Sequence, residues 1–498
     1  MAQNSLPVIE TSSGNIRGRR DQGLNIFKGV RYGADTRQTR FARPKPPQAW
    51  AGVVDAFEFG PACPQNGNEP NQSEDCLFLN VWTPTLDTRA RLPIMVYIHG
   101  GAYITGSGSS PLTDGRRLAE DHQVVVVTLN HRLNAFGYLY LDQLAPGFRP
   151  DSGNAGQWDL ILALNWLVTN GTRFGGDPKR ILLFGQSGGG AKIATLMATP
   201  SAKGLFHAVA TMSGQQVTAS GPLNATRRAQ ALCNSIGASV QDLLDLPTAR
   251  LIEALSINDP INAEQKLYFG PVLDQHMLAR HPFWPDAPAQ SAHIPMLLGN
   301  MKSETRNLIG RSLPAAFDLT FDALPEWLAR HMRTDIAPSL VIETYRRAYP
   351  DISAPDLFFA ATTAGRSWRG QVEEADARAR QGAPTWVYRF DLPSPEDGGK
   401  WGAYHTLDIP FAFKNLEAAG PMTGTGAAAR KVSLELAGAL VALAKTGRPQ
   451  IAGGPYWPCY SLANRETMIF DATTRLAHDP RGVERALFAT VPFTQWGT

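Results

Sequence analysis

The sequence predicts an α/β fold with a large, mostly parallel central sheet flanked by helices. Three continuous apolar runs are typical of strands buried on both faces: Leu92 to His99, Val124 to Asn130 and Ile181 to Phe184. Between the second and third runs, Trp158 to Thr169 carries leucines at helical spacing. A strand, a helix and another strand in this order favour a parallel sheet.

Further elements extend this sheet on both sides. Up to about Gln65, short segments interrupted by glycine and proline predict N-terminal edge strands. Apolar runs at His207 to Met212, Pro295 to Gly299 and Thr385 to Leu392 predict the strands of the second half, and Ala427 to Lys445 has the pattern of a late helix.

We expect residues 1–498 to form a single domain, because no linker, internal repeat or low-complexity tract divides the chain. Residues 313–380 have amphipathic helical patterns, which predict a helical insertion that shapes the substrate pocket. The candidate lining residues are Tyr103, Ile104, Trp327, Phe358 and Phe359.

Charge and hydropathy exclude several classes of partner. The formal net charge is +3, and the lysines and arginines form no run, so we expect no nucleic-acid partner. The apolar runs are strand-sized, far shorter than a membrane span. Residues 1–5 lack the basic and apolar regions of a signal peptide. A cytoplasmic protein and a secreted or periplasmic one that has lost its signal peptide both stay open, as does the oligomeric state.

The cysteine pattern indicates no metal site. Cys63, Cys76, Cys233 and Cys459 lack zinc-ligand spacing, and we expect neither a metal nor an organic cofactor. Cys63 and Cys76 are close enough in sequence to close a short loop, so the residues alone allow either one disulfide or four reduced thiols.

The most informative motif is Gly-x-Ser-x-Gly at residues 185–189, with Ser187 at its centre, directly after the run Ile181 to Phe184. Between a buried strand and a helix, this motif is typical of a nucleophile elbow, in which the tight turn requires small residues beside the serine. Average composition would give only about 0.2 chance matches in a chain of this length. We therefore predict that Ser187 is a nucleophile.

A serine nucleophile needs a base to take its proton and an acid to orient that base. Glu304 lies in the loop after the predicted strand 295–299, and His405 lies in a glycine-containing loop after the predicted strand 385–392. The order serine, acid, histidine is the one found in such hydrolases. We expect Ser187, Glu304 and His405 to form the triad.

The negative charge that develops on the substrate oxygen needs hydrogen-bond donors. His99-Gly100-Gly101-Ala102 follows a predicted strand and makes a turn whose backbone N–H groups can reach that oxygen. We assign the oxyanion hole to the amides of Gly101, Ala102 and Gly188. His99 is expected to be structural, because the base of this fold follows the acid in the chain.

Taken together, these residues resemble the type-B carboxylesterase family, which includes cholinesterases and bacterial esterases. The likeness covers nearly the whole chain, with matching stretches at Phe27 to Tyr32, Glu74 to Trp82, Asn130 to Leu133, Phe174 to Pro178, Phe269 to Asp274 and Tyr456 to Pro458. The resemblance implies an α/β-hydrolase fold, a triad at Ser187, Glu304 and His405, and a disulfide between Cys63 and Cys76.

The chain departs from the family pattern near the predicted site. Gln186 replaces the usual glutamate before the serine, Thr305 and Thr406 stand where glycine is common, and Asp408 replaces a glutamate. A carboxylate before the serine would favour the imidazolium. We therefore expect Gln186 to leave His405 neutral at a lower pH than in relatives.

Other polar residues are expected behind the triad. Gln186, Asp408 and Ser213 are the candidates for this supporting layer. Lys192, just after the serine, is unusual near a buried site, and the sequence allows it either to pair with Asp408 or to lie on a solvated helix face.

The predicted activity is hydrolysis of a small-molecule carboxylic ester through an acyl-enzyme. We expect this ester to be medium-sized and largely apolar, and a long acyl chain or a bulky xenobiotic stays open. An amidase or a carbamate hydrolase with the same triad is the alternative. A non-catalytic recognition domain is the remote alternative, and the three intact triad positions argue against it.

Overall fold

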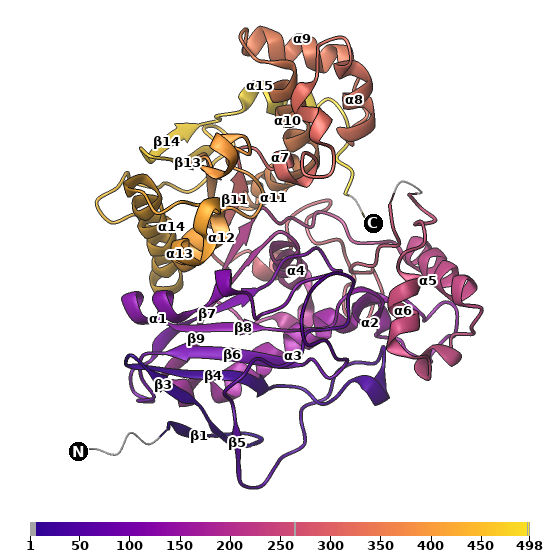
Figure 1. Ribbon diagram of the computed structural model, residues 1–498, viewed down its shortest axis with the longest axis vertical. Coiled ribbons are helices and arrows are strands. Elements are labelled where there is room, and N and C mark those ends of the chain that lie inside the picture. Colours follow the sequence, from indigo (N-terminus) through magenta and orange to yellow (C-terminus); the bar gives the residue numbers. More distant parts are fainter. Residues whose placement is uncertain (1–5, 263–264, 496, 498) are drawn as a thin grey trace.

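The computed structural model describes residues 6–262, 265–495 and 497. Over these residues, the main sheet has 11 strands in the order β14-β13-β12-β11-β10-β9-β7-β8-β6-β4-β3, and β1-β2-β5 form a smaller sheet (Figure 1). Residues 1–5, on which the prediction about a signal peptide depends, lie outside the described part of the chain.

The strand bounds match the predicted pattern, with edge strands before residue 65. The strands are β1 (Val8–Thr11), β2 (Gly14–Arg17), β3 (Arg19–Asp21), β4 (Leu24–Arg31), β5 (Val53–Asp55), β6 (Phe78–Thr83), β7 (Leu92–Ile98), β8 (Val125–Leu129), β9 (Gly176–Gln186), β10 (Ala208–Met212), β11 (Met296–Met301), β12 (Thr385–Phe390), β13 (Glu466–Phe470) and β14 (Arg475–His478).

The centre of the sheet is parallel. From β8 through β7 and β9 to β13 every neighbouring pair runs parallel, whereas β6, β4 and β3 on one side and β14 on the other pair antiparallel. The carboxyl ends of the parallel strands therefore meet at one edge, where ligands of open α/β sheets bind.

Helices lie on both faces of this sheet, and a further group of helices lies beyond its edge. They are α1 (Arg116–His122), α2 (Asn134–Tyr138), α3 (Ala155–Asn170), α4 (Gly188–Ala198), α5 (Pro222–Ile236), α6 (Thr248–Ala254), α7 (Thr305–Leu308), α8 (Leu324–His331), α9 (Pro338–Ala348), α10 (Ala354–Thr363), α11 (Arg369–Arg380), α12 (Asp408–Phe413), α13 (Leu416–Ala419), α14 (Ala427–Thr446) and α15 (Gly482–Phe488).

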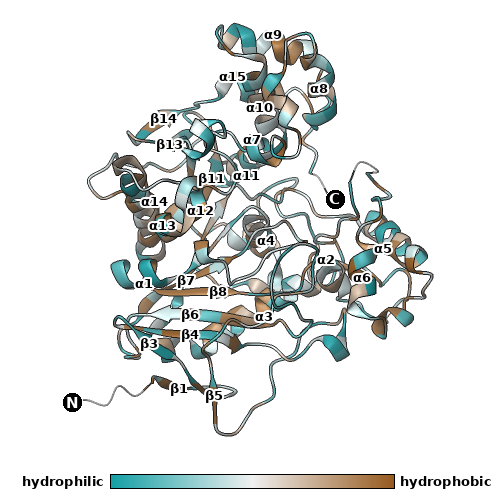
Figure 2. Cartoon of the chain, viewed as in Figure 1, coloured by the Kyte–Doolittle hydropathy of each residue, from teal (hydrophilic) through white to brown (hydrophobic). Residues whose placement is uncertain are grey.

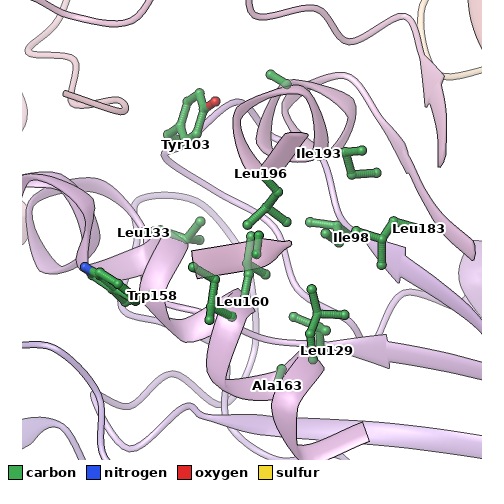
Figure 3. Close-up of a cluster of buried hydrophobic side chains, with 14 of the residues drawn as sticks. Ile98, Tyr103, Leu129, Leu133, Trp158, Leu160, Ala163, Leu183, Ile193 and Leu196 are labelled. Carbon is green, nitrogen blue, oxygen red and sulfur yellow. The ribbon is translucent and has the colours of Figure 1, made fainter. Parts of the chain in front are cut away.

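Alternate residues of the strands enter two separate cores. Ile98 and Leu183 lie in the cluster that includes Leu160 of α3 and Ile193 of α4 (Figure 3). The neighbouring strand positions, such as Tyr97, pack on the other face against α12 and α14. Burial on both faces explains why these strands are continuous apolar runs (Figure 2).

The segment 313–380 is helical, as predicted. Helices α8 to α10 gather at one end of the molecule with α15 (Figure 1). They have a core of their own, in which Phe358 and Phe359 are buried side by side with their ring centroids 5.3 Å apart. These two phenylalanines, expected to line the pocket, are therefore part of the packing of the helical segment.

The structure corrects the predicted disulfide. Cys63 and Cys76 are both buried, free thiols. The Sγ of Cys63 accepts a hydrogen bond from the Leu133 N–H at 3.2 Å. A hydrogen bond with the Cys63 thiol, together with burial, raises the pKa of Cys76 well above its usual value. Since the thiolate is the reactive form, this environment lowers the reactivity of Cys76.

No helix among the described residues is long and apolar enough to span a membrane. The same residues contain no group of three His, Cys, Asp or Glu side chains that could hold a metal ion.

Candidate active site

The turn between β9 and α4 places Ser187 in a strained backbone conformation. Its φ is 55° and its ψ is −125°, a region that non-glycine residues seldom occupy. The Ser187 N–H donates to the Met212 carbonyl at 2.7 Å, which ties the turn to the end of β10. This geometry is the sharp elbow that the sequence motif predicts.

The glycines around Ser187 are required by close contact with the end of β7. A β carbon on Gly189 would lie 1.9 Å from the Ile98 carbonyl oxygen, and one on Gly185 would lie 2.7 Å from the same atom. Real side chains do not approach a backbone oxygen so closely, so Gly-x-Ser-x-Gly is a steric requirement here.

The predicted oxyanion turn packs directly on this elbow. Gly101 and Ala102 have φ values of 78° and 53°, and the Thr105 N–H closes the turn by donating to the Gly101 carbonyl at 3.0 Å. A β carbon on Gly188 would lie 2.1 Å from the Ala102 oxygen. The three predicted donor residues therefore belong to one compact patch of backbone next to Ser187.

The predicted acid and base are in contact. Glu304 follows β11 and is completely buried. One of its oxygens, Oε1, accepts from the Met301 N–H at 2.8 Å, and the other, Oε2, is paired with Nδ1 of His405. A carboxylate only accepts hydrogen bonds, so Nδ1 carries the proton and Nε2 keeps its lone pair.

The His405 loop is held by a residue that the sequence did not single out. Asn307, three residues after the acid, donates from Nδ2 to the His405 carbonyl at 2.9 Å. Thr406 has a φ of 79°, which explains why glycine is common at this position. Asn307 lacked any motif, and only its proximity to Glu304 could have suggested it.

Gln186 contacts the imidazole directly. Its side chain is buried, and Nε2 of its amide lies 3.3 Å from Nε2 of His405. Because that ring nitrogen carries the lone pair, the amide donates to it. This contact brings the ring to the nucleophile elbow, since Gln186 and Ser187 are neighbours in the chain.

Asp408 lies behind the acid. It is completely buried, and its Oδ2 accepts from the Tyr388 hydroxyl at 2.9 Å. Burial and the nearby Glu304 carboxylate raise the pKa of Asp408 to about 7. Tyr388, on β12, was not predicted to take part in the site, because its position in an apolar strand gave no polar signal.

Ser213, the third residue predicted for the supporting layer, directly follows β10. Its N–H donates to the Gly299 carbonyl at 2.8 Å, and its φ is 49°. The structure thus places it between the strand ends that precede Glu304 and the turn that holds Ser187.

Both expectations for Lys192 were wrong. It is completely buried, so it does not lie on a solvated face, and its Nζ donates to the His99 carbonyl at 3.1 Å rather than pairing with Asp408. His99 is buried, and its ring stacks on that of His131 with the centroids 4.8 Å apart. Burial and Lys192 lower the pKa of His99 to about 3, so its ring is neutral, as expected for a structural histidine.

Comparison with known proteins identifies the family. The sequence profile of the Carboxylesterase family matches residues 5–487. This chain belongs to the carboxylesterase family. It is 33% identical to the para-nitrobenzyl esterase of Bacillus subtilis (strain 168), over 96% of this chain and 97% of that protein. It is 31% identical to the phenmedipham hydrolase of Pseudarthrobacter oxydans, over 95% of this chain and 97% of that protein.

A solved structure shows the same fold. The crystal structure of a Geobacillus stearothermophilus carboxylesterase at pH 6.2 superposes with a TM-score of 0.85 at 33% identity, covering 97% of this chain and 99% of the other. The protein is therefore a carboxylic ester hydrolase of the serine hydrolase type with the α/β-hydrolase fold.

The Gln186 contact generates a prediction about the pH profile of this carboxylesterase. The variant Gln186→Glu places a carboxylate beside His405 and favours the imidazolium. We expect the acid limb of the kcat/KM profile to move up by about one pH unit or more. The neutral variant Gln186→Met is the control, and a limb that is unmoved or lowered in Gln186→Glu contradicts the interpretation.

The raised pKa of Asp408 generates a prediction about stability. The unfolded carboxyl ionises near pH 4, whereas the folded one stays protonated up to about pH 7. Stability is therefore lost as the pH rises between these values. Asn keeps an acceptor for Tyr388 and has no proton to lose, so we expect the advantage of Asp408→Asn over the wild type to grow by roughly 3 kcal/mol from pH 5 to pH 8. Urea unfolding of both proteins at pH 5 and pH 8 measures this change. If the free energies of unfolding of the two proteins differ by the same amount at both pH values, the prediction is wrong.

Proposed function

We propose that this carboxylesterase cleaves small esters through an acyl-enzyme formed on Ser187, with His405 as the base and Glu304 as the acid. The observation that supports this assignment is the contact between Nδ1 of His405 and the buried Glu304 carboxylate. The tautomer that it favours leaves a lone pair on Nε2, which faces the Gln186 amide in this structure and takes the serine proton in the proposed reaction.

In the first half of the reaction, Ser187 attacks the ester carbonyl while Nε2 of His405 takes its proton. The buried carboxylate of Glu304 stabilises the resulting imidazolium. The amides of Gly101, Ala102 and Gly188 donate to the oxyanion of the tetrahedral intermediate. The imidazolium then protonates the leaving alcohol, and the acyl group remains on the serine.

In the second half, His405 takes a proton from water, and the hydroxide attacks the acyl carbonyl. The same amides stabilise the second tetrahedral intermediate. Its collapse returns the proton to Ser187 and releases the carboxylic acid, which restores the starting enzyme.

Loss of the nucleophile tests this mechanism. We expect Ser187→Ala and His405→Ala to lower kcat by about four to six orders of magnitude, because the triad acts as a unit. A fluorophosphonate probe should label the wild type and the control variant Ser235→Ala, whose serine is exposed and remote in sequence, but not Ser187→Ala. Retention of most activity in Ser187→Ala would rule the mechanism out.

We also propose that the chain is a single domain and that its helical segment forms one wall of the substrate pocket. The segment is tied to the site at two points. Thr305, next to the acid, donates from its hydroxyl to the Phe359 carbonyl of α10 at 2.9 Å. Glu374 of α11 accepts from the Gln216 N–H at 2.7 Å, close after Ser213. A shift of helix α10 or α11 would therefore move residues next to Glu304 and residues close to the nucleophile elbow.

The substrate class proposed is a medium-sized, largely apolar ester, in keeping with a relative named para-nitrobenzyl esterase. We expect kcat/KM on p-nitrophenyl esters to pass through a maximum at intermediate acyl length. In a matched series, the ester should react faster than the carbamate, whose carbonyl is less electrophilic, and faster than the anilide, whose amine is a poorer leaving group. A faster carbamate or anilide reaction would favour the alternative of a carbamate hydrolase or an amidase.

A further inference from the structure

Lys192 is a buried amine for which packing offers no explanation. It lies on α4, one helical turn beyond Gly188, and its exposed fraction is 0%. Its Nζ donates to the His99 carbonyl at 3.1 Å. Among the residues that the structure describes, no carboxylate forms an ion pair with it, and burial lowers its pKa to about 7.

The groups around Lys192 do not neutralise its charge. Its Nζ lies 5.5 Å from the centre of the Tyr103 ring, and the stacked rings of His99 and His131 are neutral because burial lowers the pKa of both. Beyond His131, the ion pair between Arg132 and Asp159 is already balanced, with a separation of 2.7 Å. An ammonium at this position therefore adds an uncompensated positive charge to the interior.

Such a group is costly for stability. The neighbouring residues of α4, Ile193 and Leu196, are apolar and pack in the core (Figure 3). An apolar side chain at position 192 would avoid the desolvation of a charge, and buried charges are often less stable than apolar residues of similar size. The amine must therefore contribute something other than stability.

The position of the amine indicates that contribution. The carbonyl that it holds belongs to His99, the residue immediately before the turn formed by Gly100, Gly101 and Ala102. A β carbon on Gly189 would also lie 3.1 Å from this carbonyl oxygen, so α4 and the turn meet here. Lys192 thus supports the oxyanion turn through the carbonyl of the residue that precedes it.

We propose that Lys192 is a positioning residue for the oxyanion hole, which holds the His99 carbonyl and places a positive charge behind the amides that bind the oxyanion. The inference rests on the proposed function, because only an oxyanion intermediate would use this charge. In the interior the charge acts through a low dielectric, so its effect is larger than in water. The negative charge develops in the transition state, so the effect falls on kcat rather than on KM.

Two substitutions separate the charge from the hydrogen bond. Lys192→Met removes both, whereas Lys192→Gln keeps an N–H donor for the His99 carbonyl without the charge. We expect Lys192→Met to lower kcat by about 10- to 100-fold, with KM within about twofold of the wild type. The kcat of Lys192→Gln should lie between the kcat of the wild type and that of Lys192→Met. A trifluoromethyl ketone, which forms an oxyanion on Ser187, should lose affinity by the same factor as kcat.

The pH dependence provides a readout that a purely structural role would not move. The amine of Lys192 loses its proton around pH 7, whereas the amide of Lys192→Gln does not titrate. The rings of His99 and His131 are neutral and the pKa of Tyr103 is high. Glu374, whose charge acts on Tyr103 and whose pKa burial raises to about 8, is present in both proteins, so its titration does not by itself change their ratio. The kcat/KM of the wild type, divided by that of Lys192→Gln, should therefore fall as the pH rises from 6 to 9, because the wild type loses the charge on Lys192.

Stability is measured in parallel. Since a buried charge is removed, the Tm of Lys192→Met at pH 6 should equal or exceed that of the wild type. Leu196→Ala is the matched control on α4, because it should lower the Tm by creating a cavity while kcat per labelled serine stays unchanged.

The outcomes distinguish this inference from the function on which it rests. All rates are divided by the number of serines that react with the fluorophosphonate probe. If Ser187→Ala is inactive, the role of Lys192 is refuted and the proposed function stands when Lys192→Met keeps the wild-type kcat per labelled serine, or when the ratio of kcat/KM between the wild type and Lys192→Gln does not change with pH. If Ser187→Ala is active, both are refuted.

Discussion

The contact between the nucleophile elbow and the end of β7 determines the rest of the site. Gly189 lies so close to the Ile98 carbonyl that a β carbon would be 1.9 Å from its oxygen. Gly188 packs just as closely against the backbone of Ala102. Two segments that are 86 residues apart at Ala102 and Gly188 thereby form one surface, and a larger residue at Gly188 or Gly189 would separate them. The strained backbone of Ser187 is maintained by these neighbours rather than by its own preference.

The parallel sheet completes the arrangement. Ser187 follows β9, Glu304 follows β11 and His405 follows β12, and all three strands run in the same direction. Their carboxyl ends therefore lie at one edge of the sheet, so the segments that carry Ser187, Glu304 and His405 all start from that edge. The buried bond from the Met301 N–H to Glu304 then orients the carboxylate toward the imidazole.

These features decide how much could be predicted from the sequence. The central strands were predictable because burial on both faces demands continuous apolar runs, and the elbow was predictable because its sterics demand glycine. The partners of Gln186 and Lys192 and the role of Tyr388 were not, because each depends on which segments meet in space. The disulfide that family likeness implied is absent, because Cys63 and Cys76 are free thiols here, and the pattern of residues had left both a disulfide and reduced thiols open.

The ionisable groups of the interior reveal a division between stability and function. Lys192 stands behind the oxyanion turn, Asp408 behind the acid and Glu374 behind the loop that follows Ser213, and burial is the main cause that moves the pKa of each toward neutral pH. A core selected for stability alone would hold apolar residues at these places. With its pKa raised to about 7, Asp408 is mostly protonated below that pH and then adds no second negative charge next to the Glu304 carboxylate. An ionised Asp408 would stabilise the imidazolium of His405 further and would therefore oppose the return of its proton to the leaving alcohol in the proposed mechanism.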